Sequence, residues 1–299
     1  MTLTSGFVSC PTVPDCVLPV RLNTIDFGFT EGPTNDHDGK IYFCDLKENR
    51  IHRYDTRSNE FSVWAQKTQG SNGACFLSNS TLVSCRGSAC DVVRWTADGS
   101  VDQVLASTYE GKPFNAPNDL VITKTGWIYF TDPDFDLRNH HPDAVYSISP
   151  EGEVERFDEG IRRPNGIVLS PNESKLIING TKQREIIAYD VQTDGTLTNR
   201  HVYASVRDPN REAYKGYPAD AWFGCDGMAI DEEWNLYVTC GAGVEVFNRQ
   251  RKSIGVIVTP EKPCNVCFGG PDRKMLFITA QKSLYMVPVT VPGVIFQQI

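Results

Sequence analysis

Apolar positions along the chain come in short runs rich in Val, Ile, Tyr, Phe and Thr, and turns that contain Gly, Asn, Asp or Pro separate these runs. "KIYFCD" (40–45) and "GWIYFTD" (126–132) are two such runs, and each follows a turn. The 3.6-residue spacing of an amphipathic helix is nearly absent. Regular short strands with turn signals between them predict an all-β fold, which can be a sandwich, a barrel or a propeller.

An internal repeat selects the propeller. Each unit begins with a polar residue and continues with an apolar strand, a turn and an aromatic-rich strand; a third strand follows, and often a fourth. The separations between units are 41, 46, 47, 61 and 39 residues, which is typical of propeller blades. We therefore predict one six-bladed β-propeller domain over residues 1–299, with four-stranded antiparallel blades. The six polar residues, called the polar ring below, are Glu31, Asn72, Asn118, Asn165, Asp226 and Asn265.

The repeat is irregular at two places, and each irregularity predicts a further structural feature. The last unit ends soon after its third strand, so we expect "VLPVRLNTI" (17–25) to supply the missing outer strand and close the ring. The long separation between Asn165 and Asp226 holds a Pro- and aromatic-rich insertion, at about 207–224. Loops of this length in a compact domain are often functional, and we predict that this one is a lid beside the channel mouth.

The polar ring is the candidate chemistry. The first strand of each propeller blade lines the central channel, so these six side chains should converge on its axis. All six carry oxygen ligands, as a hard divalent cation requires, and the neutral amides favour Ca²⁺ over Mg²⁺. Mg²⁺, Mn²⁺ and Zn²⁺ stay as alternatives, although the shortage of His and Cys at these positions argues against zinc. Turn chemistry would explain recurring Asn, Asp and Gly, but Glu31 is a poor turn residue, so metal binding is favoured.

Charge and cysteine usage narrow the partners. The net charge of −8 and the pI near 5.2 argue against nucleic acid and anionic membranes, and leave a small-molecule substrate. No secretory signal precedes the first strand, so we expect a cytoplasmic protein with reduced thiols. Cys264 and Cys267 form the only C-x-x-C pair; in a strand they should point to opposite faces as small buried residues. Ring closure leaves no obvious open sheet edge, which favours a monomer.

Five segments of the chain, taken together and in order, carry a family resemblance: "FTEGP", "FNAPNDLVITKTGWIYFTDP", "RRPNGIVLSP", "CDGMAIDEEWNLYVTCGAGVEVF" and "NVCFGGPDRKMLFITAQKSLYMV". They resemble the gluconolactonase, senescence marker protein and luciferin-regenerating-enzyme family, and its gluconolactonase branch most. The resemblance runs from about Phe29 to Val289 and implies a six-bladed propeller with one catalytic divalent metal, usually calcium. It places the family's metal ligands on Glu31, Asn118, Asn165 and Asp226, which leaves the other two ring residues as pocket lining.

The chain also departs from the family's pattern. "SCRGSACD" stands where gluconolactonase-like members tend to have an acidic-His pair, "TDPDFD" replaces "TDPPYG", and "IINGT" stands near the usual "ADT". These positions belong to the expected pocket wall. We therefore expect a substrate other than a standard sugar lactone.

The leading hypothesis is metal-assisted hydrolysis of a lactone or related ester, with Asp226 as both ligand and general base and Glu31 as a pure ligand. Two alternatives stay open: another metal-dependent reaction (isomerisation, rearrangement or phosphotriester cleavage) and a calcium-binding propeller without catalysis. No G-x-S-x-G sequence or dinucleotide fingerprint occurs. The candidate substrate-binding residues are Asn72, Arg86, Asp119, Phe135, His140, His141, Trp222 and Asn265.

Overall fold

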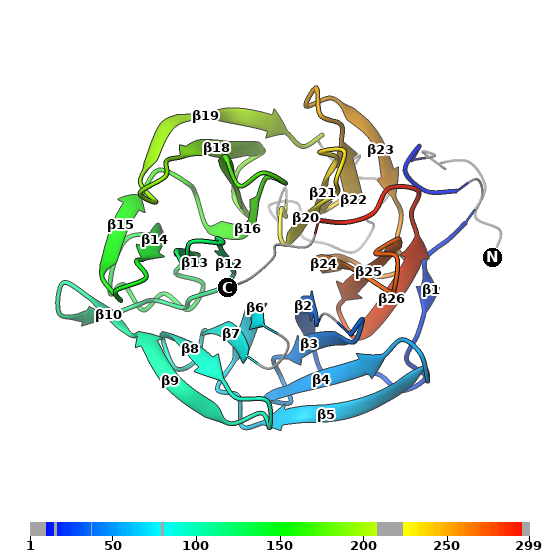
Figure 1. The fold of residues 1–299 in the computed structure, drawn as a ribbon, viewed down its shortest axis with the longest axis horizontal. Coiled ribbons are helices and arrows are strands. Elements are labelled where there is room, and N and C mark those ends of the chain that lie inside the picture. The colour runs from blue at the N-terminus through cyan, green and yellow to red at the C-terminus, as the bar shows by residue number, and fades with distance from the viewer. Residues whose placement is uncertain (1–9, 15–16, 37, 79–80, 208–223, 295–299) are drawn as a thin grey trace.

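The computed structural model describes residues 10–14, 17–36, 38–78, 81–207 and 224–294. In this part of the chain the regular elements are strands, and no helix there is long and apolar enough to cross a membrane. Six four-stranded antiparallel sheets stand around a common centre (Figure 1). The structure confirms the predicted six-bladed β-propeller.

The first three blades follow one another along the chain. The first consists of β2 (Thr30–Asn35), β3 (Ile41–Asp45), β4 (Arg50–Asp55) and β5 (Glu60–Gln66). The second consists of β6 (Ser71–Ser78), β7 (Thr81–Arg86), β8 (Asp91–Trp95) and β9 (Val101–Ala106). A small hairpin of β10 (Thr108–Tyr109) and β11 (Lys112–Pro113) leads to the third blade. This blade consists of β12 (Leu120–Ile122), β13 (Ile128–Asp132), β14 (Ala144–Ile148) and β15 (Val154–Asp158).

The last three blades complete the ring. The fourth consists of β16 (Pro164–Leu169), β17 (Lys175–Gly180), β18 (Glu185–Val191) and β19 (Leu197–Ser205). The fifth consists of β20 (Met228–Ile230), β21 (Leu236–Cys240), β22 (Gly243–Phe247) and β23 (Ser253–Ile257). The sixth consists of β24 (Pro263–Gly269), β25 (Met275–Ala280), β26 (Ser283–Pro288) and, as its outer strand, β1 (Val20–Arg21).

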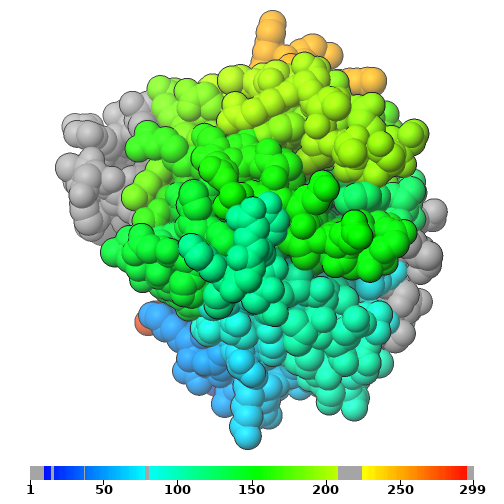
Figure 2. All heavy atoms as spheres, turned by 90° about the vertical axis from the view of Figure 1, so that its left-hand side faces the viewer, coloured from blue at the N-terminus to red at the C-terminus, as the bar shows by residue number. Residues whose placement is uncertain are grey.

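The N-terminal strand closes the ring as expected. Val20 of β1 lies opposite Met286 of β26, and Arg21 lies opposite Tyr285. Seen from the side, the outer strands of the second, third and fourth blades form a convex surface (Figure 2). Core side chains fill the space between neighbouring blades; Tyr129, Tyr146 and Tyr237 are fully buried there. The predicted lid lies almost wholly outside the described residues.

Side chains near the ends of the second strands tie four of the blades to the next blade. In four blades the penultimate residue of the second strand donates a hydrogen bond to a carbonyl at the start of the next blade's inner strand. These bonds fix the start of one inner strand relative to its neighbour. The four bonds are Cys44 Sγ to Asn72 O (3.0 Å), Thr131 Oγ1 to Asn165 O (2.8 Å), Asn179 Nδ2 to Asp226 O (2.6 Å) and Thr239 Oγ1 to Cys264 O (2.8 Å).

Glycine follows four of the six polar-ring residues because the inner strands approach one another closely at this level. A Cβ added to Gly166 would lie 2.2 Å from the carbonyl oxygen of Asp226, and one added to Gly32 would lie 1.8 Å from that of Asn72. Gly73 and Gly227 are equally crowded by the next blade. The Asn-Gly pair at 165–166 is therefore a packing contact between blades and not a hairpin turn.

Gly166→Ala should destabilise the protein by about 1–3 kcal/mol or more, because backbone would have to move to admit the new methyl group. Gly87→Ala is the matched control: its added Cβ would find its nearest atoms 3.8 Å away, so it should change stability by less than about 0.5 kcal/mol. Urea unfolding of both variants measures the difference. Equal midpoints for the two variants would contradict the close approach.

Candidate metal centre

The inner strands are irregular where the polar ring sits. The register of β2 against β3 shifts between Glu31 and Thr34, and that of β24 against β25 shifts between Pro263 and Asn265. The inner strands β12 and β20 begin only after Asn118 and Asp226. A bulge breaks the alternation of side chains along a strand and re-aims them, so consecutive residues here can both face the channel.

A cluster of three donor groups forms at this level. One carboxylate oxygen each of Glu31 and Asp226 and the Sγ atom of Cys264 all lie within 4.8 Å of one another. The Glu31 side chain is almost wholly buried, and Gly32 N–H donates to its Oε2 atom at 3.2 Å. Cys264 is buried and Asp226 half-buried. We call these three residues the donor cluster.

The carboxylates of this region raise one another's proton affinity. Burial, and then the charge of Asp226, raises the pKa of Glu31 well above its ordinary value. Burial raises the pKa of Asp226 to about 7; Lys262 opposes this increase and Asp119 adds to it. Burial also raises the pKa of Asp119 to about 7. Buried carboxylates that repel one another are stabilised by a proton or by a cation. The donor set therefore fits a divalent metal ion.

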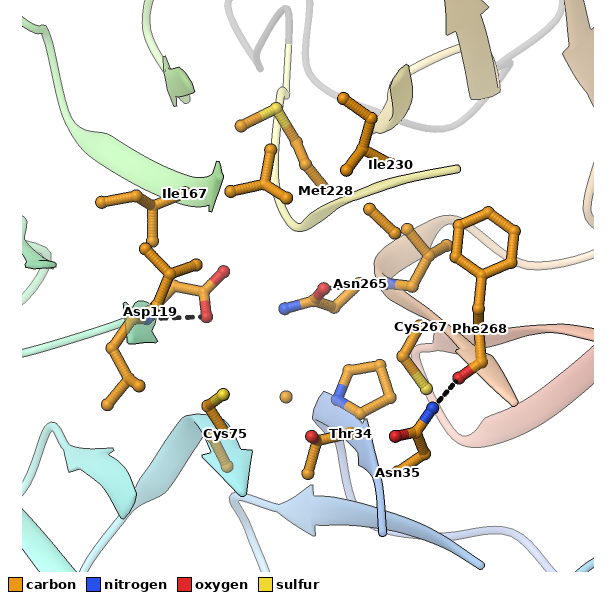
Figure 3. A pocket seen from close by; sticks show the side chains of 18 of the residues that line it. Thr34, Asn35, Cys75, Asp119, Ile167, Met228, Ile230, Asn265, Cys267 and Phe268 are labelled. Atoms are coloured by element: carbon orange, nitrogen blue, oxygen red, sulfur yellow. Dashed lines mark hydrogen bonds between the residues drawn. The ribbon is translucent and has the colours of Figure 1, made fainter. Parts of the chain in front are cut away.

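Two amide side chains of the polar ring hydrogen-bond to these carboxylates. Asn265 hydrogen-bonds through its side chain to both Glu31 and Asp119, lowering the pKa of each, while its Oδ1 accepts from Val266 N–H at 2.8 Å. Figure 3 shows Asp119 and Asn265 facing one another across the channel. Asn165 hydrogen-bonds to Asp226 and donates from Nδ2 to Thr181 Oγ1 at 2.9 Å. Asn265 thus connects carboxylates of the first and third blades, and Asn165 connects Asp226 to Thr181 of the fourth blade.

The other two ring residues are held mainly through their backbone. Asn118 is half-buried; its N–H donates to Thr131 O at 2.8 Å and its carbonyl accepts from Gly73 N–H at 2.7 Å. Asn72 is buried, and its carbonyl accepts the Cys44 thiol. Both residues occupy the ring position expected from the repeat.

A cavity of about 130 Å³ continues along the channel from the ring. Asp119 and Asn265 lie at its ring end, and later residues of the inner strands, including Cys75, Met228 and Cys267, form its wall (Figure 3). Beyond β26 the chain turns inward toward β20 (Figure 1), where Val294 N–H donates to Ile230 O at 3.2 Å and lines the cavity. Val294 therefore lies at the end of the cavity away from the ring.

The predicted pocket-wall residues lie in two different settings. Arg86 is buried, and its Nε and Nη2 atoms donate to Asp91 at 2.7 and 2.6 Å, so its guanidinium is held by a neighbouring carboxylate. Phe135 lies under the guanidinium of Arg163, 5.4 Å from ring centroid to Cζ. Arg163 stands two residues before Asn165, which places this aromatic–cation pair near the ring.

The two histidines are hydrogen-bonded to the segment 112–115. His140 Nδ1 lies 2.9 Å from Phe114 O, His141 Nε2 lies 3.5 Å from Lys112 O, and the backbone N–H groups of both donate to Asn115 Oδ1. The histidine loop is therefore fastened to the segment that follows the β10–β11 hairpin. Trp222 lies outside the described residues.

Three residues near the ring were missed by sequence reasoning. Cys264 was expected to be a small buried residue; it is buried, but its thiol belongs to the donor cluster. Lys262 lies close enough to Asp226 to lower the pKa of that carboxyl, and Arg163 covers Phe135. All three lie within three residues of a ring position, and that proximity was the available signal.

Comparison with known proteins places this geometry in a family. The model of the SMP-30/Gluconolactonase/LRE-like region matches residues 29–282. The chain belongs to this family. A gluconolactonase of Zymomonas mobilis is 31% identical over 196 residues, which cover 62% of this chain and 53% of that protein. The chain thus spans about half the length of that relative.

Two further relatives cover more of the chain. A regucalcin of Xenopus laevis is 24% identical over 256 residues, covering 82% of this chain and 80% of that protein. A solved gluconolactonase structure from Xanthomonas campestris is 28% identical, with a TM-score of 0.80 and 95% of each chain covered. The propeller is therefore shared along nearly its whole length.

The raised pKa values predict how pH acts on the metal-free protein. Asp119 and Asp226 bind protons more tightly in the folded state than at their ordinary value of 3.8. The stability that they contribute is present at low pH and is lost as pH rises through about 7. The Tm of chelator-treated protein should therefore fall between about pH 4 and 7 less steeply in Asp119→Asn than in the wild type, and added Ca²⁺ should raise the wild-type Tm most at the higher pH. Identical pH slopes for the two proteins would contradict this account.

Proposed function

We propose that the protein is a divalent-metal-dependent lactonase, with Ca²⁺ as the expected ion. The observation that carries this proposal is the pair of neighbouring carboxylates, buried Glu31 and half-buried Asp226, which lie close together among amide side chains. The names of two relatives, both gluconolactonases, support the reaction class. The name regucalcin supports a role for calcium.

Each residue near the cluster has a proposed role. A bound divalent cation would polarise the lactone carbonyl and stabilise the charge that develops on its oxygen. Glu31, Asn118, Asn165 and Asp226 would hold the cation. Asp226 would also accept a proton from the attacking water, because it is a carboxylate at the cation. Asp119, bonded to Asn265, would keep the neighbouring groups in place.

The substrate is proposed to be a lactone other than a standard sugar lactone, bound by a monomer. Two of the departures from the family pattern serve the fold: Arg86 pairs with Asp91, and Asn179 links the fourth blade to Asp226. The third departure includes Phe135, which lies under Arg163. An aromatic ring beside a guanidinium, with the Lys262 charge near Asp226, favours a lactone that carries an apolar face and an anionic group.

Asp226→Asn should lower kcat by at least about 100-fold, since it removes the proposed general base, and should weaken Ca²⁺ binding by at least about tenfold. Asp272→Asn, an exposed turn carboxylate on the sixth blade, is the matched control and should change neither quantity. Calorimetric titration with Ca²⁺ and steady-state kinetics measure the two effects. Full activity and full metal binding in Asp226→Asn would refute the role assigned to this residue.

A lactone panel tests the reaction itself. Chelator-stripped protein should release no acid in a pH-stat, and Ca²⁺ should restore the release; the product should be heavier than the substrate by one water. A product with the same mass as the substrate would show that the reaction is a rearrangement and not hydrolysis. Calcium binding without turnover of lactones or phosphotriesters would leave a calcium-binding propeller as the better account.

A further inference from the structure

Cys264 brings a soft ligand into a site otherwise built from oxygen atoms. Its Sγ atom lies within 4.8 Å of carboxylate oxygens of both Glu31 and Asp226, and its side chain is buried. The bulge between Pro263 and Asn265 explains why two consecutive residues both reach the channel region: the thiol reaches the cluster and Asn265 lines the cavity. Nothing in the oxygen-based account of the metal site uses this thiol.

The backbone holds Cys264 in place. Its carbonyl oxygen accepts hydrogen bonds from Thr239 Oγ1 and from Gly227 N–H, both at 2.8 Å and both from the preceding blade. The thiol itself lies 3.9 Å from Lys262 O, a weak contact for a sulfur donor. The backbone of Gln281 also hydrogen-bonds to the thiol. Because the backbone of Cys264 is fixed, rotation of its side chain would turn the sulfur toward an ion without moving the strand.

The distances fit one small ion. Zinc takes sulfur at about 2.3 Å and carboxylate oxygen at about 2.0–2.2 Å, so tetrahedral ligand atoms stand roughly 3.5 Å apart. Donor atoms within 4.8 Å of one another need shifts of about 1 Å or less to reach that spacing. Thiolate is a soft ligand that suits zinc, cobalt and cadmium, whereas Ca²⁺ takes oxygen.

We propose that Cys264 is a metal ligand for thiophilic divalent cations only. Such an ion is bound by Glu31, Asp226 and the Cys264 thiolate, whose proton passes to solvent, whereas Ca²⁺ is bound by oxygen atoms with the thiol protonated. This inference rests on the proposed metal site and adds a selectivity to it. The site then discriminates between two classes of cation through one side chain.

Cobalt is the probe, because a cobalt–thiolate bond produces a charge-transfer band in the near ultraviolet. Stripped wild-type protein titrated with Co²⁺ should develop this band, and Cys264→Ser should lose it. Cys267→Ser is the matched control: it removes the other thiol of the pair, which lines the cavity outside the donor cluster, and should keep the band. Cys264→Ser should weaken Co²⁺ and Cd²⁺ binding by at least about tenfold and change Ca²⁺ affinity by less than about threefold.

The outcomes separate this inference from the proposed function. Cobalt binding without the band in the wild type, or equal Cd²⁺ affinity in Cys264→Ser, would overturn the role of Cys264 and leave an oxygen-bound calcium site intact. Binding of neither Co²⁺ nor Ca²⁺ by the wild type would overturn both proposals. Cys264→Thr, also without a thiol, should behave like the serine variant; it replaces that variant if a thermal melt shows that the serine protein is unfolded.

Discussion

The close approach of neighbouring inner strands at one level of the channel is the constraint on which the site depends. At this level the carbonyl of Asp226 occupies the space where a side chain of residue 166 would begin, and Asn179 holds that carbonyl from the fourth blade. Thr239 does the same for Cys264 from the fifth blade. The backbones that carry the donor side chains are therefore held at a fixed spacing before any ligand binds, and rotation of the side chains adjusts the distances between donor atoms.

The fixed spacing of these backbones also explains why the carboxyl pKa values are raised. Glu31 and Asp226 come from blades far apart in sequence, yet the charge of Asp226 raises the pKa of Glu31. In a flexible site the two carboxylates would separate and be hydrated; here burial and the contacts between blades keep them together. The metal-free state is therefore held under charge repulsion, which a cation relieves. Affinity for the ion and instability in its absence have the same physical origin.

The ring architecture could be predicted from sequence because the repeat of polar residue, strand and turn is long and regular. The closing strand near Val20 could also be predicted, because the last repeat unit has no outer strand of its own. The donor cluster could be predicted only in part. Along a regular strand, successive side chains point to opposite faces of the sheet, so the sequence predicts which residues face one another; this rule fails at bulges. That rule placed Cys264 and Cys267 on opposite faces of the strand as small buried residues and gave neither a role; the Cys264 thiol lies beside Glu31, and Cys267 lines the cavity.

A residue that departs from the family pattern can serve the fold or the binding of substrate, and the sequence alone does not distinguish these two roles. Asp45 and Asp132 end the second strands of their blades and accept two backbone N–H groups each from the segment that leads to their own inner strand. Arg86 ends the second strand of the second blade and pairs with Asp91 instead. At this position the second blade thus has a buried arginine–carboxylate pair in place of the carboxylate–backbone hydrogen bonds of the first and third blades. Phe135 and Lys262 differ from Arg86 in this respect, because Phe135 contacts the Arg163 guanidinium and Lys262 acts on the Asp226 carboxyl at the ring.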